Sequence, residues 1–366
     1  MHNEHEVMRS RTCVKCPAKG ILAGLDAKKA AYCQQCFIAM VKHKFSSAIG
    51  KRRVYRDGNA KETLIIFEGT SASAFLLAMI VEGLKPSAHK KLTIDPTVMV
   101  LLSVRDRNEI ECVVQKISEF RIVLPVRWFF IHYAAILSSS LESSFGEEVV
   151  GLKELDNWNY LLESCQSETI RVELMRIVRT NLCVRVAEYL RIGKVMFPDS
   201  ADYLAKCALS TLALGRGCSI ASLTAVVQRL MTASIIRPLR DISEKEICIV
   251  NKFQNSDQFL IILPDFCASE GRTKQSNNIQ DLTADFITTL QLDGYCGTIP
   301  TVLGTASKLQ SVTTGKQKCE LCFSSYDPEN ELDRFCYGCN RVVSEIRSSA
   351  VLEELLPRLT TSFRGY

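Results

Sequence analysis

Two sets of four cysteines, one near each end of the chain, constrain the fold more than any other feature. The first set reads C-x2-C-x16-C-x2-C and comprises Cys13, Cys16, Cys33 and Cys36. The second set reads C-x2-C-x13-C-x2-C and comprises Cys319, Cys322, Cys336 and Cys339. Two CxxC pairs separated by a short ribbon can place four thiolates around one Zn²⁺ ion. The spacing therefore predicts two small zinc modules that frame a larger domain.

Four thiolates fill a tetrahedral coordination sphere, so these zinc sites are expected to hold shape and not to activate water. Such sites contribute on the order of 10–16 kcal/mol of apparent binding energy to modules too small to fold alone. An iron–sulfur cluster is the alternative, because the same ligand set can hold one. The other cysteines are scattered singly, as expected of small buried side chains in a reducing compartment: Cys112, Cys165, Cys183, Cys207, Cys218, Cys248, Cys267 and Cys296.

Composition places the chain among ordinary soluble proteins. It has 366 residues, of which 47% are hydrophobic and 23% are charged, enough for one large core domain with small satellites. The stretch Met1–Arg11 is polar and lacks the apolar segment of a secretion signal. No apolar run approaches the roughly 18 residues that a membrane span needs. We therefore expect an intracellular protein with no membrane segment.

The positive charge is concentrated in one segment. Between Ala27 and Arg56 there are eight Lys or Arg residues and no Asp or Glu. A surface of one sign attracts phosphate backbones, and this segment is contiguous with the first cysteine set. The pattern predicts an RNA-binding surface whose candidate contacts are Lys42, Lys44, Lys51, Arg52 and Arg53. The alternative is a solvated linker helix, since the apolar residues of Phe37–Ile49 have helical spacing.

The middle of the chain alternates between strand and helix patterns. Thr63–Phe67 is a wholly apolar run typical of a buried parallel strand, and a loop of small residues over Glu68–Ser73 leads into an apolar helix over Ala74–Glu82. Strand, loop and helix in this order open an α/β nucleotide-binding unit. Further strands are predicted over 98–104, 121–126 and 194–197, and helices over 108–120, 152–163, 167–189 and 199–213. The alternation predicts an α/β fold with a doubly wound, mostly parallel sheet.

These patterns divide the chain into seven segments. We predict a flexible tail (1–10), an N-terminal zinc ribbon (11–38), a basic helix and linker (39–60), an α/β domain (61–267), a connector packed on the core (268–316), a C-terminal zinc ribbon (317–342) and a C-terminal helix and tail (343–366). The connector contains one helical pattern, over 279–290. The last segment has an apolar face within 344–359 that is expected to dock as a helix.

Several segments together carry a specific resemblance. They read YCQQCFIAMVKHKFSSAIGKRRVY, LIIFEGTSASAFLL, VMFPDSADYLAKCALSTLALGRGCSIA, RPLRDISEKEI and CELCFSSYDPENELDRFCYGC. In content and order they resemble the cytoplasmic tRNA 2-thiolation protein 2 family over about residues 11–342. The resemblance implies a cytoplasmic protein with the PP-loop fold of ATP pyrophosphatases, flanked by the two cysteine modules.

The resemblance also implies partners and chemistry. Members of this family work with tRNA and with a paralogous catalytic thiolase subunit, in a complex that 2-thiolates wobble uridine. The sulfur is expected to arrive as the thiocarboxylate of a ubiquitin-related modifier. The expected reaction is adenylation of the uridine O2 by ATP, followed by attack of sulfur. We assign the residues for that chemistry to the partner and none to this chain.

The loop after the first strand departs from the pattern of active PP-loop enzymes, which is Ser-Gly-Gly-x-Asp-Ser. Gly69 and Ser73 match this pattern, but Thr70 replaces a glycine and Ala72 replaces the aspartate. Glu68 also places a negative charge where phosphate would bind. We interpret this segment as a vestigial phosphate loop that retains Gly69, Ser71 and Ser73, and we expect little or no ATP turnover by the chain alone.

Two other functions are compatible with the sequence. The chain could be an autonomous ATP-dependent tRNA sulfurtransferase, although none of its core cysteines forms a CxxC pair for handling sulfur. It could instead be a zinc-ribbon adaptor in ubiquitin-like conjugation, although its two cysteine sets lie about 300 residues apart. Arg216, between two glycines, fits either a phosphate or partner contact or a plain helix C-cap turn. Asp199 is interpreted as a helix cap or as part of the nucleotide pocket.

Overall fold

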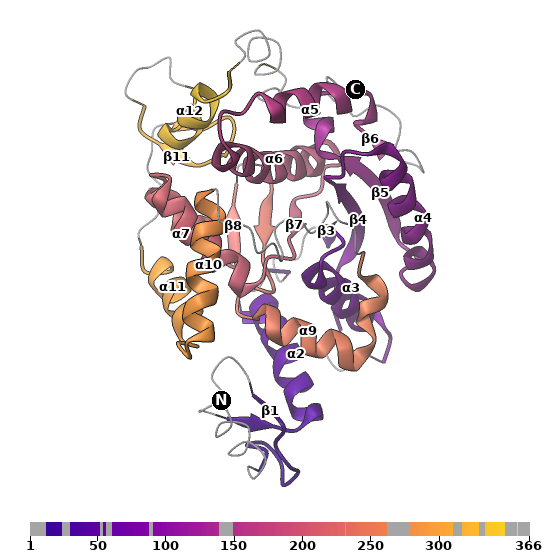
Figure 1. The fold of residues 1–366 in the computed structure, drawn as a ribbon. Helices are drawn as coiled ribbons and strands as arrows, with labels where there is room; N and C mark the ends of the chain where they lie inside the picture. Colours follow the sequence, from indigo (N-terminus) through magenta and orange to yellow (C-terminus); the bar gives the residue numbers. More distant parts are fainter. Residues whose placement is uncertain are drawn as a thin grey trace.

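A sheet of seven strands, with helices on both faces, organises the part of the chain that the structure describes (Figure 1). The structure is a computed structural model. It describes residues 12–23, 30–51, 54–55, 61–87, 91–138, 149–230, 232–261, 278–309, 317–328, 334–347 and 357. The tail over 1–10, Arg52, Arg53, Cys267 and most of the segment over 343–366 lie outside these residues. Among the described residues, no helix is both long enough and apolar enough to cross a bilayer.

The sheet is doubly wound, as the sequence predicts. In spatial order its strands are β6 (Val149–Val150), β5 (Arg127–His132), β4 (Asp95–Leu102), β3 (Glu62–Phe67), β7 (Lys194–Met196), β9 (Ser234–Ile236) and β8 (Val227–Arg229). All neighbours are parallel except β8, which runs antiparallel to β9. Strands β4 and β7 lie on opposite sides of β3, so the direction of winding reverses there. In open α/β sheets, ligand sites form beside the carboxyl ends of the strands at such a reversal.

Helices cover the two faces of the sheet because the buried strands are apolar on both sides. Along β3, Ile65 and Phe67 pack with one face, whereas Leu64 and Ile66 pack with the other. The first face is covered by α2 (Gln34–Lys51), α3 (Ser71–Leu84), α4 (Arg107–Val123) and α9 (Glu244–Gln254). The second face is covered by α5 (Leu155–Glu163) and α6 (Glu168–Tyr189). Helix α2, which carries Cys36 of the first cysteine module, is thus part of the core.

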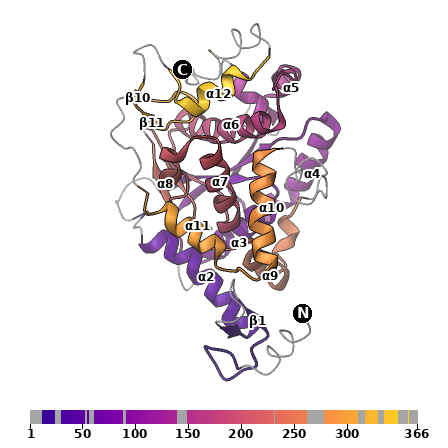
Figure 2. The same ribbon diagram turned by 60° about the vertical axis from the view of Figure 1, so that its left-hand side comes forward.

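Three further helices pack together beside the sheet (Figure 2). They are α7 (Ala201–Ala213), α10 (Ile279–Leu292) and α11 (Thr298–Ala306), and they share a cluster of buried side chains that includes Leu204, Ile287 and Leu303. The helical pattern predicted over 279–290 corresponds to α10.

The remaining elements are short. They are β1 (Leu22–Ala23), β2 (Ala31–Tyr32), η1 (Tyr133–Leu137), η2 (Leu152–Glu154), η3 (Gly217–Ser219), α8 (Ile220–Leu223), η4 (Ser256–Phe259), β10 (Gln317–Lys318), β11 (Ser325–Tyr326) and α12 (Tyr337–Ser344). The β1–β2 pair belongs to the first cysteine module, and β10, β11 and α12 belong to the second.

The strand predicted over 121–126 is wrong, because α4 continues to Val123 and the strand begins at Arg127. Helix α4 begins with a side-chain cap from Asp106, and its last turn buries Phe120 against the core. The apolar Ile122 that suggested a strand is 82% exposed on the outside of that turn. Pro125 then separates the helix from the strand, because proline has no N–H group to donate.

Candidate functional site

The first cysteine module brings its four thiols together. The Sγ atoms of Cys13, Cys16, Cys33 and Cys36 all lie within 4.8 Å of one another. Those of Cys16 and Cys33 are 3.6 Å apart, and those of Cys16 and Cys36 are 3.7 Å apart. Four sulfurs bound tetrahedrally at about 2.3 Å from Zn²⁺ are separated by about 3.8 Å. The predicted ligand set therefore has the geometry of a single four-thiolate metal site.

The second module forms an equivalent site. The Sγ atoms of Cys319, Cys322, Cys336 and Cys339 lie within the same 4.8 Å limit, and those of Cys322 and Cys336 are 3.6 Å apart. Phe323 follows the first pair with a positive φ of 60°, which turns the chain back toward the sulfurs. An all-thiolate donor set suits Zn²⁺ or an iron–sulfur cluster. Both predicted cysteine sets are thus assembled.

The second module is built into the core. Cys319 and Cys339 are fully buried, and they belong to the same apolar cluster as α6 and one face of the sheet. On α6, Asn181 donates from Nδ2 to the backbone oxygen of Leu321 at 2.9 Å. After α12, the backbone N–H of Arg347 donates to Ser164. The second module is therefore held to α6 by a side-chain hydrogen bond, and the segment after α12 is held to the C-terminal end of α5 by a main-chain one.

The loop between β3 and α3 is held by its own hydrogen bonds. Gly69 has a φ of 71°, a conformation that favours glycine. Thr70 is the N-cap of α3, and its hydroxyl accepts a hydrogen bond from the backbone N–H of Ser73 at 3.2 Å. Ser73 is fully buried and donates its hydroxyl to the backbone oxygen of Thr70. The carbonyl oxygen of Ser71 accepts from Asn251 on α9 at 2.9 Å. Of the three predicted phosphate-loop residues, Ser73 serves the helix cap and Ser71 contacts α9.

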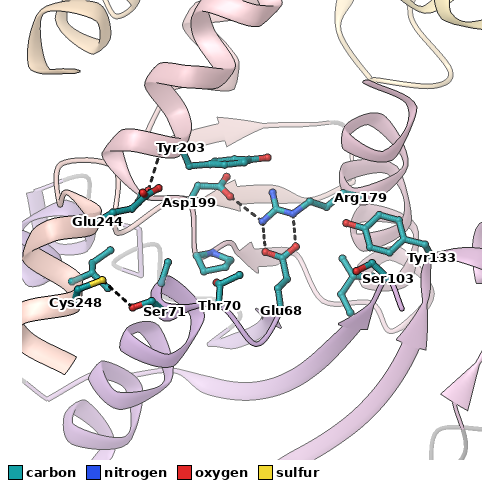
Figure 3. A pocket seen from close by; sticks show the side chains of 15 residues that line it. Glu68, Thr70, Ser71, Ser103, Tyr133, Arg179, Asp199, Tyr203, Glu244 and Cys248 are labelled. Carbon is teal, nitrogen blue, oxygen red and sulfur yellow. Dashed lines mark hydrogen bonds and ion pairs between the residues drawn. The ribbon is translucent and has the colours of Figure 1, made fainter. Parts of the chain in front are cut away.

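An arginine from α6 occupies the space beside this loop (Figure 3). Arg179 reaches Glu68 with two nitrogens, one of which is 2.8 Å from Oε2, and its Nη2 is 2.9 Å from Oδ1 of Asp199. Asp199 also pairs with the buried Arg237 at 2.9 Å. The guanidinium of Arg179 lies over the ring of Phe197, 4.5 Å from its centroid. Burial alone lowers the pKa of Arg179, but the charges of Asp199 and Glu68 raise it well above its ordinary value.

These residues line a cavity of about 290 Å³ at the carboxyl ends of β3 and β7. Glu68, Thr70 and Ser71 come from the loop after β3, and Asp199 comes from the loop after β7. The lining contains three carboxylates, the third from Glu244, and one guanidinium, which is already paired. Like charge disfavours an anionic ligand. The cavity lies where a nucleotide site is expected, yet the one cation among its lining residues is already bound by carboxylates.

The predicted RNA contacts on α2 differ in their surroundings. Lys42 pairs with Glu82 at 2.6 Å, and Lys44 pairs at 2.8 Å with Glu246, whose side chain is only 2% exposed. Both ammonium groups are therefore compensated, Lys44 by a buried carboxylate and Lys42 by a half-exposed one. Lys51 lies exposed at the end of the helix. Arg52 and Arg53 lie outside the described residues.

Sequence comparison identifies the relatives of the chain. A model of the cytoplasmic tRNA 2-thiolation protein 2 family matches residues 278–335. The protein of that name from Caenorhabditis elegans is 36% identical over 319 residues, which cover 86% of this chain and 90% of the relative. This chain belongs to the cytoplasmic tRNA 2-thiolation protein 2 family. The family protein from Anopheles gambiae is 30% identical over 359 residues, covering 95% of this chain and 83% of the relative.

A solved structure shares the fold of this family member. The U34-tRNA thiolase NcsA from Methanococcus maripaludis, a structure with a 4Fe-4S cluster, superposes with a TM-score of 0.59. It is 14% identical, and the match covers 91% of this chain and 96% of that chain. The resemblance recognised from the sequence and the α/β fold class are both confirmed.

The sequence patterns do not indicate the charge network of this cavity. Arg179 lies within a predicted helix, and its contact with Glu68 joins residues 111 positions apart. The available signal was Glu68 itself, since a carboxylate in a buried loop needs a cation as partner. Asp199 was predicted as a cap or pocket residue and does line the cavity, although the cap of α7 is Ser200.

Proposed function

We propose that the chain is a non-catalytic subunit of the cytoplasmic system that 2-thiolates the wobble uridine of tRNA. Its membership of the cytoplasmic tRNA 2-thiolation protein 2 family supports a role in this modification. In the proposed complex it binds tRNA and a paralogous catalytic thiolase subunit, and the sulfur comes from a thiocarboxylated ubiquitin-related modifier. ATP is used on the partner.

The observation that carries the non-catalytic assignment is the ion pair between Arg179 and Glu68. A cation beside the loop would favour phosphate, but this guanidinium is bound by two carboxylates of its own chain. A nucleotide would have to break these contacts and leave Glu68 and Asp199 beside its own negative charge. The retained glycine and serines of the loop do not compensate, because Ser73 is buried beneath the helix cap.

Removing the carboxylate tests this assignment directly. The wild-type chain is expected to show no saturable binding of Mg-ATP or pyrophosphate in calorimetry. Glu68→Ser frees one side of the Arg179 guanidinium, and we expect it to gain measurable pyrophosphate affinity. Glu244→Ser is the matched control, because it removes a carboxylate from the same cavity without freeing that guanidinium. Saturable ATP binding by the wild type, or pyrophosphate release with tRNA and no partner, would instead support an autonomous enzyme.

Two metal centres accord with a structural role. With four thiolates each, they provide no open position for a substrate, and the residues present fit Zn²⁺. Zinc would supply cross-linking of chain segments that are otherwise too short to fold. We propose structural zinc at both sites. Metal analysis and the absorption spectrum of the purified protein distinguish zinc from an iron–sulfur cluster.

The proposed tRNA contact lies at the end of α2. Because Lys42 and Lys44 are already paired with carboxylates of this chain, we place the contact mainly on Lys51, Arg52 and Arg53. Charge reversal of these three residues is expected to weaken tRNA binding and to reduce its salt slope by up to about 3, roughly 1 per phosphate contact. Lys116→Glu, on the exposed face of α4, is the control. Unchanged affinity and salt dependence of the triple variant would refute this placement.

The partners are tested separately from the tRNA contact. Co-expression with the paralogous thiolase subunit and a mass measurement of the purified complex report whether the two chains associate. Addition of tRNA, ATP and the thiocarboxylated modifier then reports 2-thiouridine formation. We expect product from the complex and none from this chain alone.

A further inference from the structure

Arg216 lies at the contact between the core and the C-terminal metal centre. It follows α7 and Gly215, whose φ of 75° turns the chain away from the helix. Its side chain is only 5% exposed. One terminal nitrogen is 2.7 Å from Oε1 of Glu173 on α6, and the other donates to the Sγ of Cys339 at 3.0 Å. The guanidinium therefore bridges a buried carboxylate and a metal-ligating sulfur.

Neighbouring groups fix this side chain in place. Arg176 holds Glu173 from the opposite side with two hydrogen bonds of 2.6 and 2.9 Å. The backbone N–H of Arg216 donates to Thr211 at 2.9 Å. Gly338, in the CxxC pair itself, leaves room for the arginine, because a Cβ there would lie 2.0 Å from Nε. The Gly-Arg-Gly segment and the last CxxC pair are thus fitted to each other.

The chemistry of the centre explains why a cation belongs there. Four thiolates around Zn²⁺ carry a net charge of −2, and burial of an uncompensated charge is costly. A guanidinium that donates to one thiolate offsets this charge and withdraws electron density from that sulfur. Such a donor also fixes the position of the sulfur, as partners of metal ligands generally do.

The N-terminal centre has a different environment. Cys13 is buried, but Cys16, Cys33 and Cys36 are partly exposed. The sulfur of Cys13 accepts from backbone N–H groups, those of Lys15, Cys16 and Cys33, and the bond from Lys15 is 3.4 Å long. This hydrogen bond from a neutral donor is longer than the 3.0 Å bond from the charged Arg216 to Cys339.

We propose that Arg216 is a positioning residue of the C-terminal metal centre, and that it makes this centre resistant to metal loss while the N-terminal centre exchanges its metal readily. The two cysteine sets have nearly the same spacing but different chemistry. Among the described residues, the difference lies in a cation that the core supplies to the sulfur of Cys339.

Cobalt is a suitable probe, because the thiolate-to-cobalt charge-transfer band reports the ligands directly. The full-length protein is loaded with Co²⁺ at both centres, and the loss of that band is followed after addition of excess EDTA. We expect two phases in the wild type. A Cys13→Ser/Cys16→Ser variant, which lacks the N-terminal centre, should retain only the slow phase.

Arg216→Met removes the cation but keeps much of its volume. We expect the slow phase to accelerate by at least about 10-fold, a typical effect of removing a partner of a metal ligand, and the fast phase to stay unchanged. The charge-transfer band of the slow centre should shift to lower energy, because the sulfur loses its hydrogen-bond donor. Arg216→Lys should recover part of both effects, and Gly338→Ala should reproduce the loss by displacing the arginine.

The control is Arg341→Met on α12, since Arg341 is exposed and pairs with Glu345. It should change neither the slow phase nor the band. The proposal is overturned if the wild type loses its metal in one phase. It is also overturned if Arg216→Met leaves the slow phase or the band unchanged, or if it accelerates both phases equally.

Discussion

Removal of the Arg179 side-chain charge should destabilise the fold by an amount that its surroundings define. Arg179, Glu68 and Asp199 have side chains that are 11%, 18% and 4% exposed. In Arg179→Met, Asp199 keeps its contact with Arg237 at 2.9 Å, whereas Glu68 loses its two hydrogen bonds to the guanidinium. Removing one partner of a buried ion pair costs about 3–5 kcal/mol. Because one of the two carboxylates stays paired, we expect a loss near the lower end, about 3 kcal/mol.

Equilibrium unfolding in urea, followed by far-ultraviolet ellipticity, measures this loss. For an m-value of about 3 kcal/mol/M, the midpoint should fall by about 1 M without a change in m. The double variant Arg179→Met/Glu68→Gln removes the stranded charge and should recover at least about 1 kcal/mol. Arg171→Met on the same helix breaks an exposed pair with Glu168 and should cost less than about 1 kcal/mol. A loss below about 1 kcal/mol in Arg179→Met would refute the argument from burial.

Three further predictions concern the loop, the N-terminal helix and acid stability. Thr70→Ala should cost about 1 kcal/mol of unfolding free energy through loss of the helix cap, and Thr70→Ser should restore it; equal losses in both would contradict the cap. Lys44→Met should destabilise the fold by more than Lys42→Met. The carboxylate of Glu246, which pairs with Lys44, is buried, whereas that of Glu82, which pairs with Lys42, is 48% exposed. Equal urea midpoints of the two variants would exclude this difference. Burial lowers the pKa of His132 to about 4, below the unfolded value of about 6.5. The unfolded chain therefore takes up the proton first, and stability should fall by about 3 kcal/mol as the pH drops from 6.5 to 4; His132→Gln should show a shallower slope.

Local patterns in the sequence predicted the elements whose stability is local. The cysteine spacings predicted two groups of four neighbouring thiols that could each hold a metal ion, and the helix predicted over 167–189 corresponds to α6. The prediction of a strand over 121–126 was wrong because apolar residues also occur in the last turn of an amphipathic helix. Ile122 is 82% exposed, so hydrophobicity alone did not report burial there.

The interactions that define the cavity and the C-terminal centre join segments that are distant in the sequence. The spacing of residues along the chain does not indicate such contacts. The contact of Arg179 with Glu68 spans 111 residues, and that of Arg216 with Cys339 spans 123. The sequence showed that Glu68 departs from the pattern of active PP-loop enzymes, and it marked Arg216 as a candidate contact or helix C-cap. It did not show the partner of either residue. Similarly, the positive segment suggested a free basic surface, whereas Lys44 is matched by a glutamate 202 residues away.

Placing the last thiols of the chain inside its main apolar cluster has a consequence for protein synthesis. A ribosome adds about 5–20 residues per second, so the 123 positions between Arg216 and Cys339 take about 6–25 s to make. During that interval α6 has emerged without the segment that covers its outer side. The apolar side chains of α6 that contact the second cysteine module therefore stay exposed until that module has been translated. A chaperone that covers these side chains, or metal that assembles the second cysteine module as it emerges, would shorten that exposure.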